Sequence, residues 1–454
     1  TEKLPVDKAL EDVKEFFSSL EDVHPNLLAK VRSKDYLELK NHVFHEVNNR
    51  LSKNGAVRIR DLAFLLYYAA AFFKDGHTTA LWTQQPNRTN TGAMRFPPFV
   101  LKSRNGRFFI ENAVDKSLPG SEVISINDTP ILQFLKPILD RCSGETLPSK
   151  AIRFTEWDQP FWWFFADLLS AKRELRVTLV QPPGTSFERS LGTVPFDVFH
   201  ALAQATGHDF SGSSRLSFLA DGNIALLRCP QFLYSDAEKE NIGRIFREIR
   251  SKDAHSLIID IRSNSGGDSR MGDYIFQFLT QERFKPVSRM LVKLSPQLLE
   301  NQYKDYSDRP GETITKFGTE ISPQSSNAVF HGKIWLLADN GTYSSATMFA
   351  AMFRDYEVGE IVGYETGGTV THFGDQLMLT LENSRIPYKV SYKTFYSPFP
   401  KPGDDAHGVL PTIPITDGIL AKYKSRKDPI LAFAIKRIHA HSEVLAPKQV
   451  MPRQ

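Results

Sequence analysis

Hydrophobic residues in the first ninety positions recur at the spacing of an α-helix. The clearest face consists of five apolar residues three or four positions apart: Val6, Leu10, Val13, Phe17 and Leu20. Pro25 ends this segment, because proline disrupts a helix interior. Similar spacing predicts helices over 36–51 and 60–73. We therefore expect a helical N-terminal domain over residues 1–92, with a polar boundary loop at 84–92.

Residues 93–190 follow the shorter period of β-strands. Two β-rich runs flank Asn105-Gly106, a strong hairpin signal, and further short strands are expected within 120–131 and 175–184. We expect a small β-rich domain here, followed by a linker over 191–213. Its aromatic stretch, 154–169, favours a buried helix; an apolar wall of a substrate groove is the alternative.

From residue 214 to 454, apolar strands alternate with amphipathic helices. The strands read as continuous apolar runs, "IALLR", "LIIDI", "IWLLA" and "EIVGY". Such runs are typical of parallel strands covered on both faces. The pattern predicts an open, mostly parallel α/β core, with a hairpin around Asn383-Ser384.

Composition narrows the function. The chain has 454 residues, 56 Lys+Arg against 52 Asp+Glu, and 41% hydrophobic residues, which excludes a disordered or collagen-like chain and a disulfide scaffold. Its small, evenly spread positive excess predicts no nucleic-acid partner and no strong electrostatic preference for a substrate. The longest apolar run, 62–73, is too short to span a membrane. Cys142 and Cys229 either pair or stay reduced. An extracytoplasmic location is expected although no signal segment is present, and a cytoplasmic one stays open.

Two strand ends carry candidate chemistry. The first runs into Gly266-Gly267, where the backbone can turn tightly and expose N–H groups; a plain strand-helix turn is the alternative. No Lys-Ser/Thr follows, which disfavours nucleotide binding. At the second, Ser344 precedes an apolar helix, where it either caps the helix or acts as a nucleophile beside the N–H of Ser345.

A nucleophilic serine needs a base, and spacing alone cannot choose among the histidines. The candidates are His77, in a polar turn after an apolar helix, His372 in "TVTHFGD" and His407 in "DDAHGVLP". His42 and His45 share a helical face, but no third ligand is evident, so neither a metal nor another cofactor is predicted.

Several segments, in order, resemble the carboxyl-terminal processing (tail-specific) peptidases and their tricorn-core relatives. The matching stretches are "KDGHTTALW", "GSEVISINDTPI", "LIIDIRSNSGG", "DNGTYSSATMF", "IVGYETGG" and "HGVLPTIPIT". The resemblance implies a catalytic core of the ClpP/crotonase-like type, with a PDZ-like β-rich domain. That domain lacks a clear carboxylate-binding loop, for which 95–99 is the nearest candidate.

The resemblance also implies residue roles. Ser344 aligns with the catalytic serine, and Gly266 and the Ser345 N–H with the oxyanion hole, for which Gly267 could substitute. The processing branch uses a lysine base, but Gly368-Thr369 stands at its place. The branch that uses histidine instead implies His77 as base, with Asp405 in place of a glutamate. Asp404 and Glu365 are the alternatives to Asp405.

The expected function is a serine endopeptidase that forms an acyl-enzyme on Ser344, with a protein or peptide substrate. Two alternatives stay open. One is a non-catalytic relative that binds an apolar ligand, to which Trp157, Trp162 and Trp163 would be suited. The other is an esterase or amidase with the same triad.

Overall fold

The chain folds into two compact units in the computed structural model, which describes residues 2–82, 94–157, 160–169, 172–181, 184–206, 212–219 and 222–445. The first unit comprises Thr1–Asp209, Lys285–Glu320 and Gly367–Gly408; the second comprises Phe210–Phe284, Ile321–Thr366 and Val409–Gln454. The division at 209/210 lies near the predicted start of the core at 214. The segments 285–320 and 367–408, predicted within the core, belong instead to the first unit.

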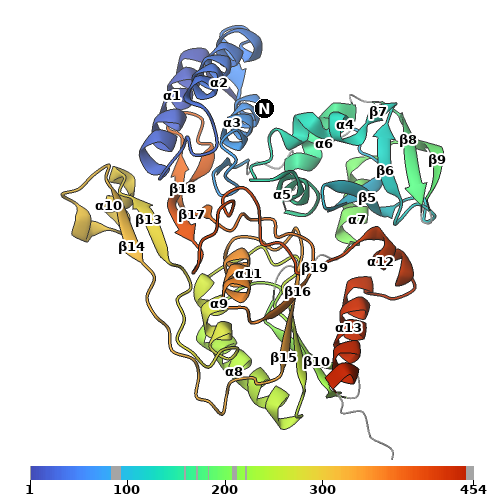
Figure 1. Ribbon diagram of the computed structural model, residues 1–454. Helices are drawn as coiled ribbons and strands as arrows, with labels where there is room; N and C mark the ends of the chain where they lie inside the picture. Colours follow the sequence, from blue (N-terminus) through green and yellow to red (C-terminus); the bar gives the residue numbers. More distant parts are fainter. Residues whose placement is uncertain are drawn as a thin grey trace, which may run out of the picture. The chain divides into compact units, whose positions relative to one another are not determined.

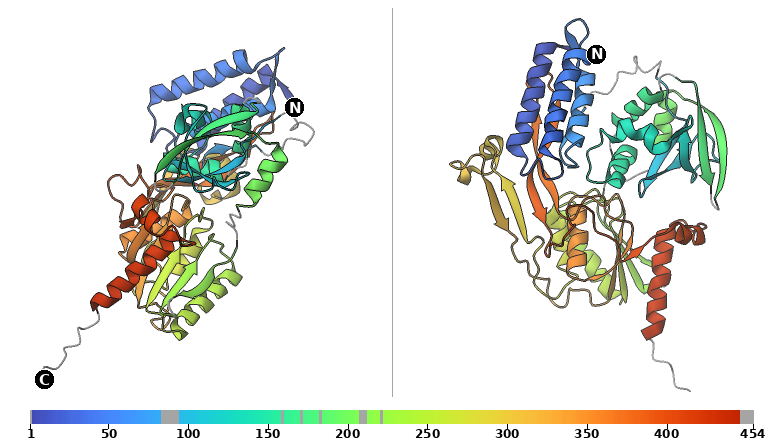
Figure 2. Two further views of the ribbon diagram at one scale, coloured as in Figure 1. Left: turned by 90° about the vertical axis from the view of Figure 1, so that its right-hand side faces the viewer. Right: turned by 45° about the horizontal axis from the view of Figure 1, so that its top comes forward.

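Three helices form the N-terminal part of the first unit and lie side by side in Figures 1 and 2. They are α1 (Val6–Val23), α2 (Ser33–His45) and α3 (Ile59–Ala71). Val13, Phe17 and Leu20 of the predicted face are buried. A π-helical turn, Glu46–Leu51, follows α2, and the short strands β1 (Lys3–Pro5) and β2 (Ala56–Arg58) pair in antiparallel fashion. The predicted helices are thus present, while the boundary loop at 84–92 lies outside the described residues.

A five-stranded sheet explains why the later segments belong to this unit. β14 (Thr313–Phe317), β13 (Arg289–Lys293), β18 (Pro387–Tyr396) and β17 (His372–Thr380) lie in that order, and β3 (Thr79–Ala80) also pairs with β18. The predicted hairpin around Asn383-Ser384 is confirmed as β17–β18. Asp12 of α1 accepts hydrogen bonds from the backbone N–H groups of Asn383 and Ser384, at 3.0 and 2.7 Å.

The β-rich part of the first unit is an antiparallel sheet. Its strand order is β4 (Phe99–Arg104), β5 (Arg107–Ala113), β6 (Glu122–Ile126), β8 (Glu174–Gln181) and β9 (Thr185–Gly192), with β7 (Thr129–Pro130) on β6. The hairpin predicted at Asn105-Gly106 is confirmed, with positive φ at both residues. The helices are α4 (Ile131–Leu139), α5 (Leu147–Ile152) and α6 (Pro160–Leu169), with a π-helical turn at Arg153–Trp157.

Two expectations for this part are settled by burial. In the aromatic stretch, Phe154, Phe161 and Phe165 are buried in the main core, so the buried-helix interpretation holds. Residues 191–213 are not a simple linker, which corrects the prediction. Helix α7 (Phe196–Gln204) lies there, and its Phe199 and Leu202 pack in a cluster with Phe96 and Val100. Burial of these side chains holds the segment against β4.

The second unit is built on a mostly parallel sheet, as the predicted fold class requires. Its order is β10 (Arg215–Leu219), β11 (Ile224–Arg228), β12 (Ser256–Asp260), β15 (Lys333–Ala338), β16 (Gly359–Gly363) and β19 (Ile413–Pro414). Only β10 pairs antiparallel to its neighbour. The helices are α8 (Asp236–Ser251), α9 (Ser269–Phe276), α11 (Ser345–Asp355), α12 (Asp417–Lys422) and α13 (Pro429–Leu445).

Helices explain the continuous apolar strands of this sheet. Ala434 and Ile438 of α13 cluster with Ile258, Trp335 and Val362 on one face. Every residue of β12 is buried, as expected for a strand covered on both sides. Because β12 and β15 are parallel neighbours, their carboxyl ends bring Gly266-Gly267 and Ser344 to the same sheet edge.

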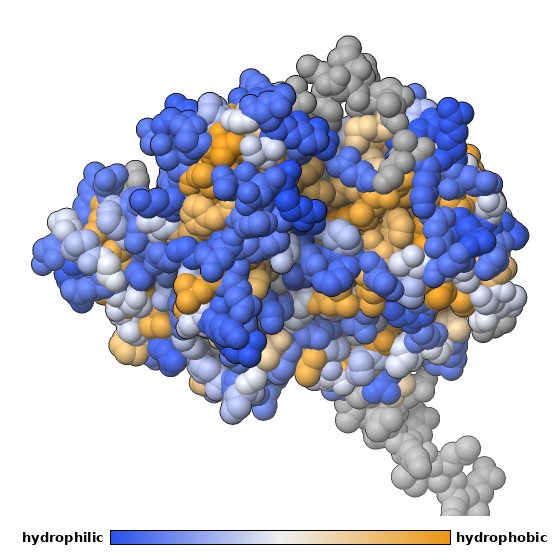
Figure 3. Space-filling view, turned by 90° about the horizontal axis from the view of Figure 1, so that it is seen from above, coloured by the Kyte–Doolittle hydropathy of each residue, from blue (hydrophilic) through white to orange (hydrophobic). Residues whose placement is uncertain are grey.

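The surface and the two cysteines bear on the expectations drawn from composition. In the face shown in Figure 3, hydrophilic residues cover much of the surface and apolar ones lie in small patches between them. Among the described residues, no helix combines the length and apolarity that crossing a bilayer requires. Cys142 and Cys229 are both buried and free, so they do not form a disulfide.

Candidate active site

Ser344 has an unusual backbone conformation for a residue with a side chain. It stands immediately before α11 with φ 54° and ψ −125°, and its side chain makes no capping hydrogen bond. Its neighbours fix this turn: the Tyr343 N–H donates to Asn264 O at 2.9 Å, and the Met348 N–H donates to Ser344 O at 3.0 Å. Such strain at the start of a helix is typical of functional residues. Of the two interpretations of Ser344, the structure disfavours capping.

The two glycines at the end of β12 approach their neighbours too closely for any side chain. Gly266 and Gly267 have φ of 104° and 131°. A Cβ on Gly266 would lie 2.8 Å from Ser344 Cβ, and one on Gly267 would lie 2.2 Å from Phe232 O. The first distance places the glycine turn directly against Ser344. Both positions therefore require glycine.

The N–H groups around Ser344 differ in their availability. The Gly266 N–H donates to Asn264 Oδ1 at 2.8 Å, and Asn264 Nδ2 donates to Cys229 O at 2.9 Å. The Ser345 N–H belongs to the first turn of α11, where the helix supplies no acceptor. Among the described residues we find no acceptor for the N–H groups of Ser345 and Gly267. Ser345 Oγ donates to Gly267 O at 3.1 Å, so these two residues are in contact.

His77 lies in a buried polar turn between α3 and β3, in the first unit. The turn is organised by Asp75, whose carboxylate is fully buried. Asp75 Oδ1 accepts from the His77 backbone N–H at 2.9 Å, an Asx turn. Its Oδ2 accepts from Thr78 Oγ1 at 2.5 Å and from Ser391 Oγ of β18 at 2.7 Å. His24 Nε2 lies 3.4 Å from the same oxygen.

Electrostatics keep this cluster in a defined charge state. Burial raises the pKa of Asp75, but its interactions with His24 and the hydrogen bond from Thr78 outweigh burial and hold the pKa well below its usual range. Burial lowers the pKa of His77 to about 4, although Asp75 opposes this shift. The imidazole of His77 is therefore neutral at neutral pH and able to accept a proton.

The other histidines singled out in the sequence lie elsewhere or serve other contacts. The ring of His372 stacks on that of His77, with 6.1 Å between centroids, and burial lowers its pKa too. His407 is half-buried, and its Nδ1 lies 2.9 Å from Gly408 O.

One group of residues has its potential ligand atoms close enough together to hold a metal ion. Ligand atoms of Asp75, His77 and Glu145 lie within 4.8 Å of one another. However, Asp75 accepts the hydrogen bonds given above, and Glu145 Oε1 accepts from the Gly76 N–H at 3.2 Å. Because these oxygens already have protein donors, the arrangement is explained without an ion.

The three carboxylates suggested as the third member of the triad, beside Ser344 and His77, differ in their surroundings. Asp405 is exposed, whereas Asp404 is buried and its Oδ2 accepts from the Lys401 N–H at 2.9 Å. Glu365 is half-buried and belongs to the second unit. Sequence reasoning did not single out Asp75, whose Oδ1 lies 3.9 Å from His77 Nδ1. The available signal was an aspartate two positions before a histidine in a polar turn, the spacing of an Asx turn.

Comparisons with known proteins show similarity to peptidases. Residues 223–415 match the model of peptidase family S41. The fold is similar to that of mature CPAF (15% identity, TM-score 0.61, 90% of this chain and 92% of that one) and of mature CPAF complexed with lactacystin (14%, 0.63, 95% and 97%). A putative peptidase from Parabacteroides merdae is also similar (14%, 0.51, 95% and 96%). No curated protein matches the chain.

The structural likenesses, at such low identity, establish a shared fold, and the family match supports serine-protease chemistry in general terms. The matched residues include both strand ends that meet at Ser344. Over residues 223–415 the chain is similar to peptidase family S41, a family of serine proteases, and this similarity supports a hydrolase.

Proposed function

We propose that the protein is a serine endopeptidase that forms an acyl-enzyme on Ser344, with His77 as general base. The observation that carries the proposal is the strained, uncapped Ser344 beside two N–H groups without an acceptor in the described chain, those of Gly267 and Ser345. A nucleophile with adjacent preorganised donors is the arrangement that acyl transfer requires.

In the proposed mechanism, neutral His77 takes the proton of the Ser344 hydroxyl as Oγ attacks the scissile carbonyl. The Ser345 and Gly267 N–H groups bind the developing oxyanion. We assign this role to Gly267 rather than Gly266, because the Gly266 N–H already donates to Asn264. Protonated His77 then gives its proton to the leaving amine, and water releases the acyl group by the reverse proton path.

Two carboxylates are proposed to support His77 in different ways. Asp75 is a positioning residue, because it binds the backbone of His77 and ties the turn to β18. The resemblance gives Asp405 the role of stabilising the protonated imidazole. Its exposure argues for a small electrostatic contribution, since water screens exposed ion pairs.

Labelling and cleavage together test this function. A fluorophosphonate should label the wild type and not Ser344→Ala, and a peptide library should be cleaved by the wild type alone. Ser344→Ala and His77→Ala are each expected to lower kcat by about four orders of magnitude or more. Ser263→Ala is the matched control, because Ser263 also has a positive φ, of 57°, at the neighbouring strand end. Labelling without peptide cleavage would point to an esterase, and no labelling of folded protein would contradict catalysis by Ser344.

A further inference from the structure

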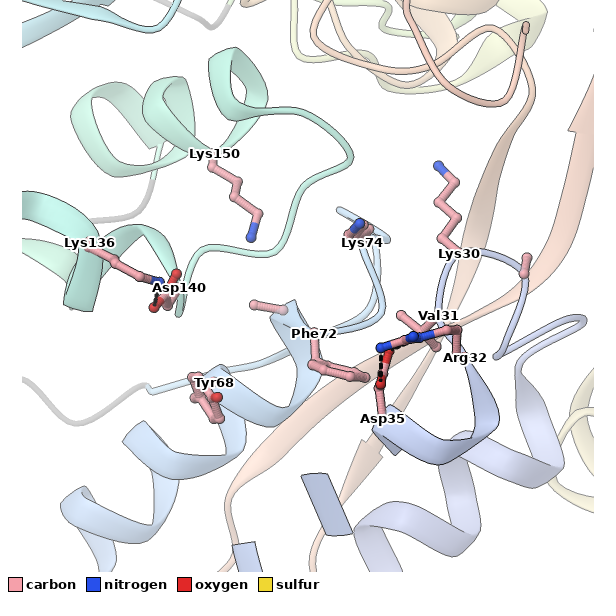
Figure 4. Close-up of a pocket in the computed structure, with 12 residues that line it drawn as sticks. Lys30, Val31, Arg32, Asp35, Tyr68, Phe72, Lys74, Lys136, Asp140 and Lys150 are labelled. Carbon is pink, nitrogen blue, oxygen red and sulfur yellow. Dashed lines mark hydrogen bonds and ion pairs between the residues drawn. The ribbon is translucent and has the colours of Figure 1, made fainter. Parts of the chain in front are cut away.

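A cavity of about 720 Å³ in the first unit collects basic side chains from four separate segments (Figure 4). Lys30 and Arg32 precede α2, Lys74 follows α3, Lys136 belongs to α4 and Lys150 to α5. The nearly balanced charge of the whole chain therefore conceals a local concentration. Because the segments are far apart in sequence, the concentration appears only in the folded unit.

The cavity has fewer negative groups than positive ones. Its two acidic side chains are both paired: Asp35 with Arg32, at 2.7 and 2.8 Å, and Asp140 with Lys136, at 2.6 Å. Among the residues that the structure describes, we find no carboxylate in ion-pair contact with Lys30, Lys74 or Lys150. These three lysines carry charge that an anionic ligand would compensate.

Lys150 is half-buried in the wall of this cavity. Its stem packs against Gly144, where a Cβ would lie 3.1 Å from Lys150 Cγ. Burial lowers the pKa of Lys150; Cys142 and Asp140 oppose this shift, while the charges of Lys74 and Lys136 add to it. In Figure 4 its amine points into the cavity. An anion there would favour the protonated amine and relieve the repulsion.

The cavity continues toward the turn that carries His77. A neighbouring hollow of about 350 Å³ shares Lys74, Lys136 and Lys150 and is also lined by Glu145. Glu145 in turn lies within 4.8 Å of the ligand atoms of Asp75 and His77. All of these residues belong to the first unit, so the cavity and the turn that carries His77 are parts of the same compact unit.

We propose that this lysine cavity binds acidic side chains of polypeptide substrates, so that cleavage favours peptides with Asp or Glu near the scissile bond. The proposal rests on the peptidase function above. The walls also contain Val31, Tyr68 and Phe72, which suit the apolar parts of a polypeptide. A phosphate group is a poorer fit, since phosphate sites favour arginine forks, and Arg32 is already paired.

The test uses two fluorogenic peptides that share a cleavable sequence from the library and differ only in flanking Asp/Glu against Asn/Gln. The wild type should prefer the acidic peptide in kcat/KM by about tenfold at low salt, mainly through KM, and lose most of this preference at high salt. In Lys30→Gln/Lys150→Gln the ratio should fall to about one. Lys252→Gln/Lys333→Gln removes two exposed lysines of the second unit and should keep the ratio.

Binding separates this proposal from the proposed function. Fluorescence anisotropy on Ser344→Ala should show tighter binding of the acidic peptide, and Lys30→Glu in the same background should reverse the order. If this preference appears while the wild type cleaves no peptide, the result supports acidic-peptide binding by the cavity and contradicts the peptidase function. Cleavage without any acid preference would overturn the cavity's role. So would saturable binding of inorganic phosphate or phosphatidylserine vesicles in place of the acidic peptide.

Discussion

Ser344 and His77 are held by different means in the two units. In the second unit, backbone geometry fixes the serine: a strained turn, two glycines in close contact and parallel strands that end together. In the first unit, side chains fix the histidine: one buried carboxylate collects a backbone N–H and hydroxyls from the turn and from β18. The closely packed backbone around Ser344 tolerates almost no added atom. The hydrogen-bonded cluster around His77 weakens in steps as its members are removed.

The largest effect should come from disturbing the closely packed backbone around Ser344. Gly267→Ala places a Cβ 2.2 Å from Phe232 O at a φ of 131°, and Phe232 O is a main-chain atom that cannot move aside as a flexible side chain would. We expect a loss of about 3 kcal/mol or more in the free energy of unfolding, and no detectable peptidase activity. Denaturant unfolding and kcat/KM measure the two effects.

Gly222→Ala is the matched control for this change. Gly222 also has a positive φ, of 96°, in the second unit, but nothing lies within 4 Å of its added Cβ. This variant should lose only about 1 kcal/mol from backbone strain. Equal losses in both variants would show that φ alone, rather than contact with Phe232, requires the glycine.

The next largest effect should come from the centre of the polar cluster. In Asp75→Asn, one oxygen becomes an amide donor that faces the donors bound by the carboxylate. We expect kcat to fall about a hundredfold, with little change in KM, because small misplacement of a catalytic base has this effect. Asp75 also raises the pKa of His77, so its loss should move the acid limb of activity to lower pH.

Asp405→Asn provides the comparison for the same role. A larger loss of kcat in Asp405→Asn than in Asp75→Asn would assign the main support of His77 to the exposed carboxylate. A fall in activity with an unmoved pH profile in Asp75→Asn would reduce Asp75 to a purely structural residue.

The contrast between the two units also explains what the sequence could predict. Glycines at a strand end and a serine before an apolar helix are local sequence patterns, so both could be predicted. Once the strands are taken to form a parallel sheet, the carboxyl ends of β12 and β15 are expected at the same edge. The Asp75 cluster joins His24 at the end of α1, the turn after α3 and Ser391 of β18, which lies 316 residues after Asp75. The same holds for the first unit's sheet, whose strands β13 and β17 read locally as parts of the α/β core. No local periodicity encodes such long-range pairing.

The pH profile tests the electrostatic side of the cluster. Burial lowers the pKa of His77 from 6.5 to about 4, so activity should be lost only as the pH falls through about 4. At pH ~5.5, about 97% of His77 would be neutral, against about 9% at the ordinary pKa, a tenfold difference in kcat/KM. The unfolded chain takes up this proton at higher pH, so stability should also fall between pH 6.5 and 4.

Profiles of kcat/KM from pH ~3.5 to 8, with circular dichroism to confirm folding, provide the measurement. An acid limb near pH 6.5 would mean that His77 is more hydrated than its burial indicates, or that another group is the base.

The smallest effect should come from the edge of the cluster. Ser391→Ala removes one hydrogen bond of 2.7 Å to the Asp75 carboxylate, which keeps its other donors. We expect a loss of about 1.5 kcal/mol in stability and a few-fold decrease in kcat. Ser397→Ala is the control, because Ser397 is also buried in the first unit but its hydroxyl has no partner in the described structure. It should be nearly neutral, since no hydrogen bond is lost. If the two variants behave alike, the bond from β18 does not position His77, and the turn alone would be sufficient to hold the base.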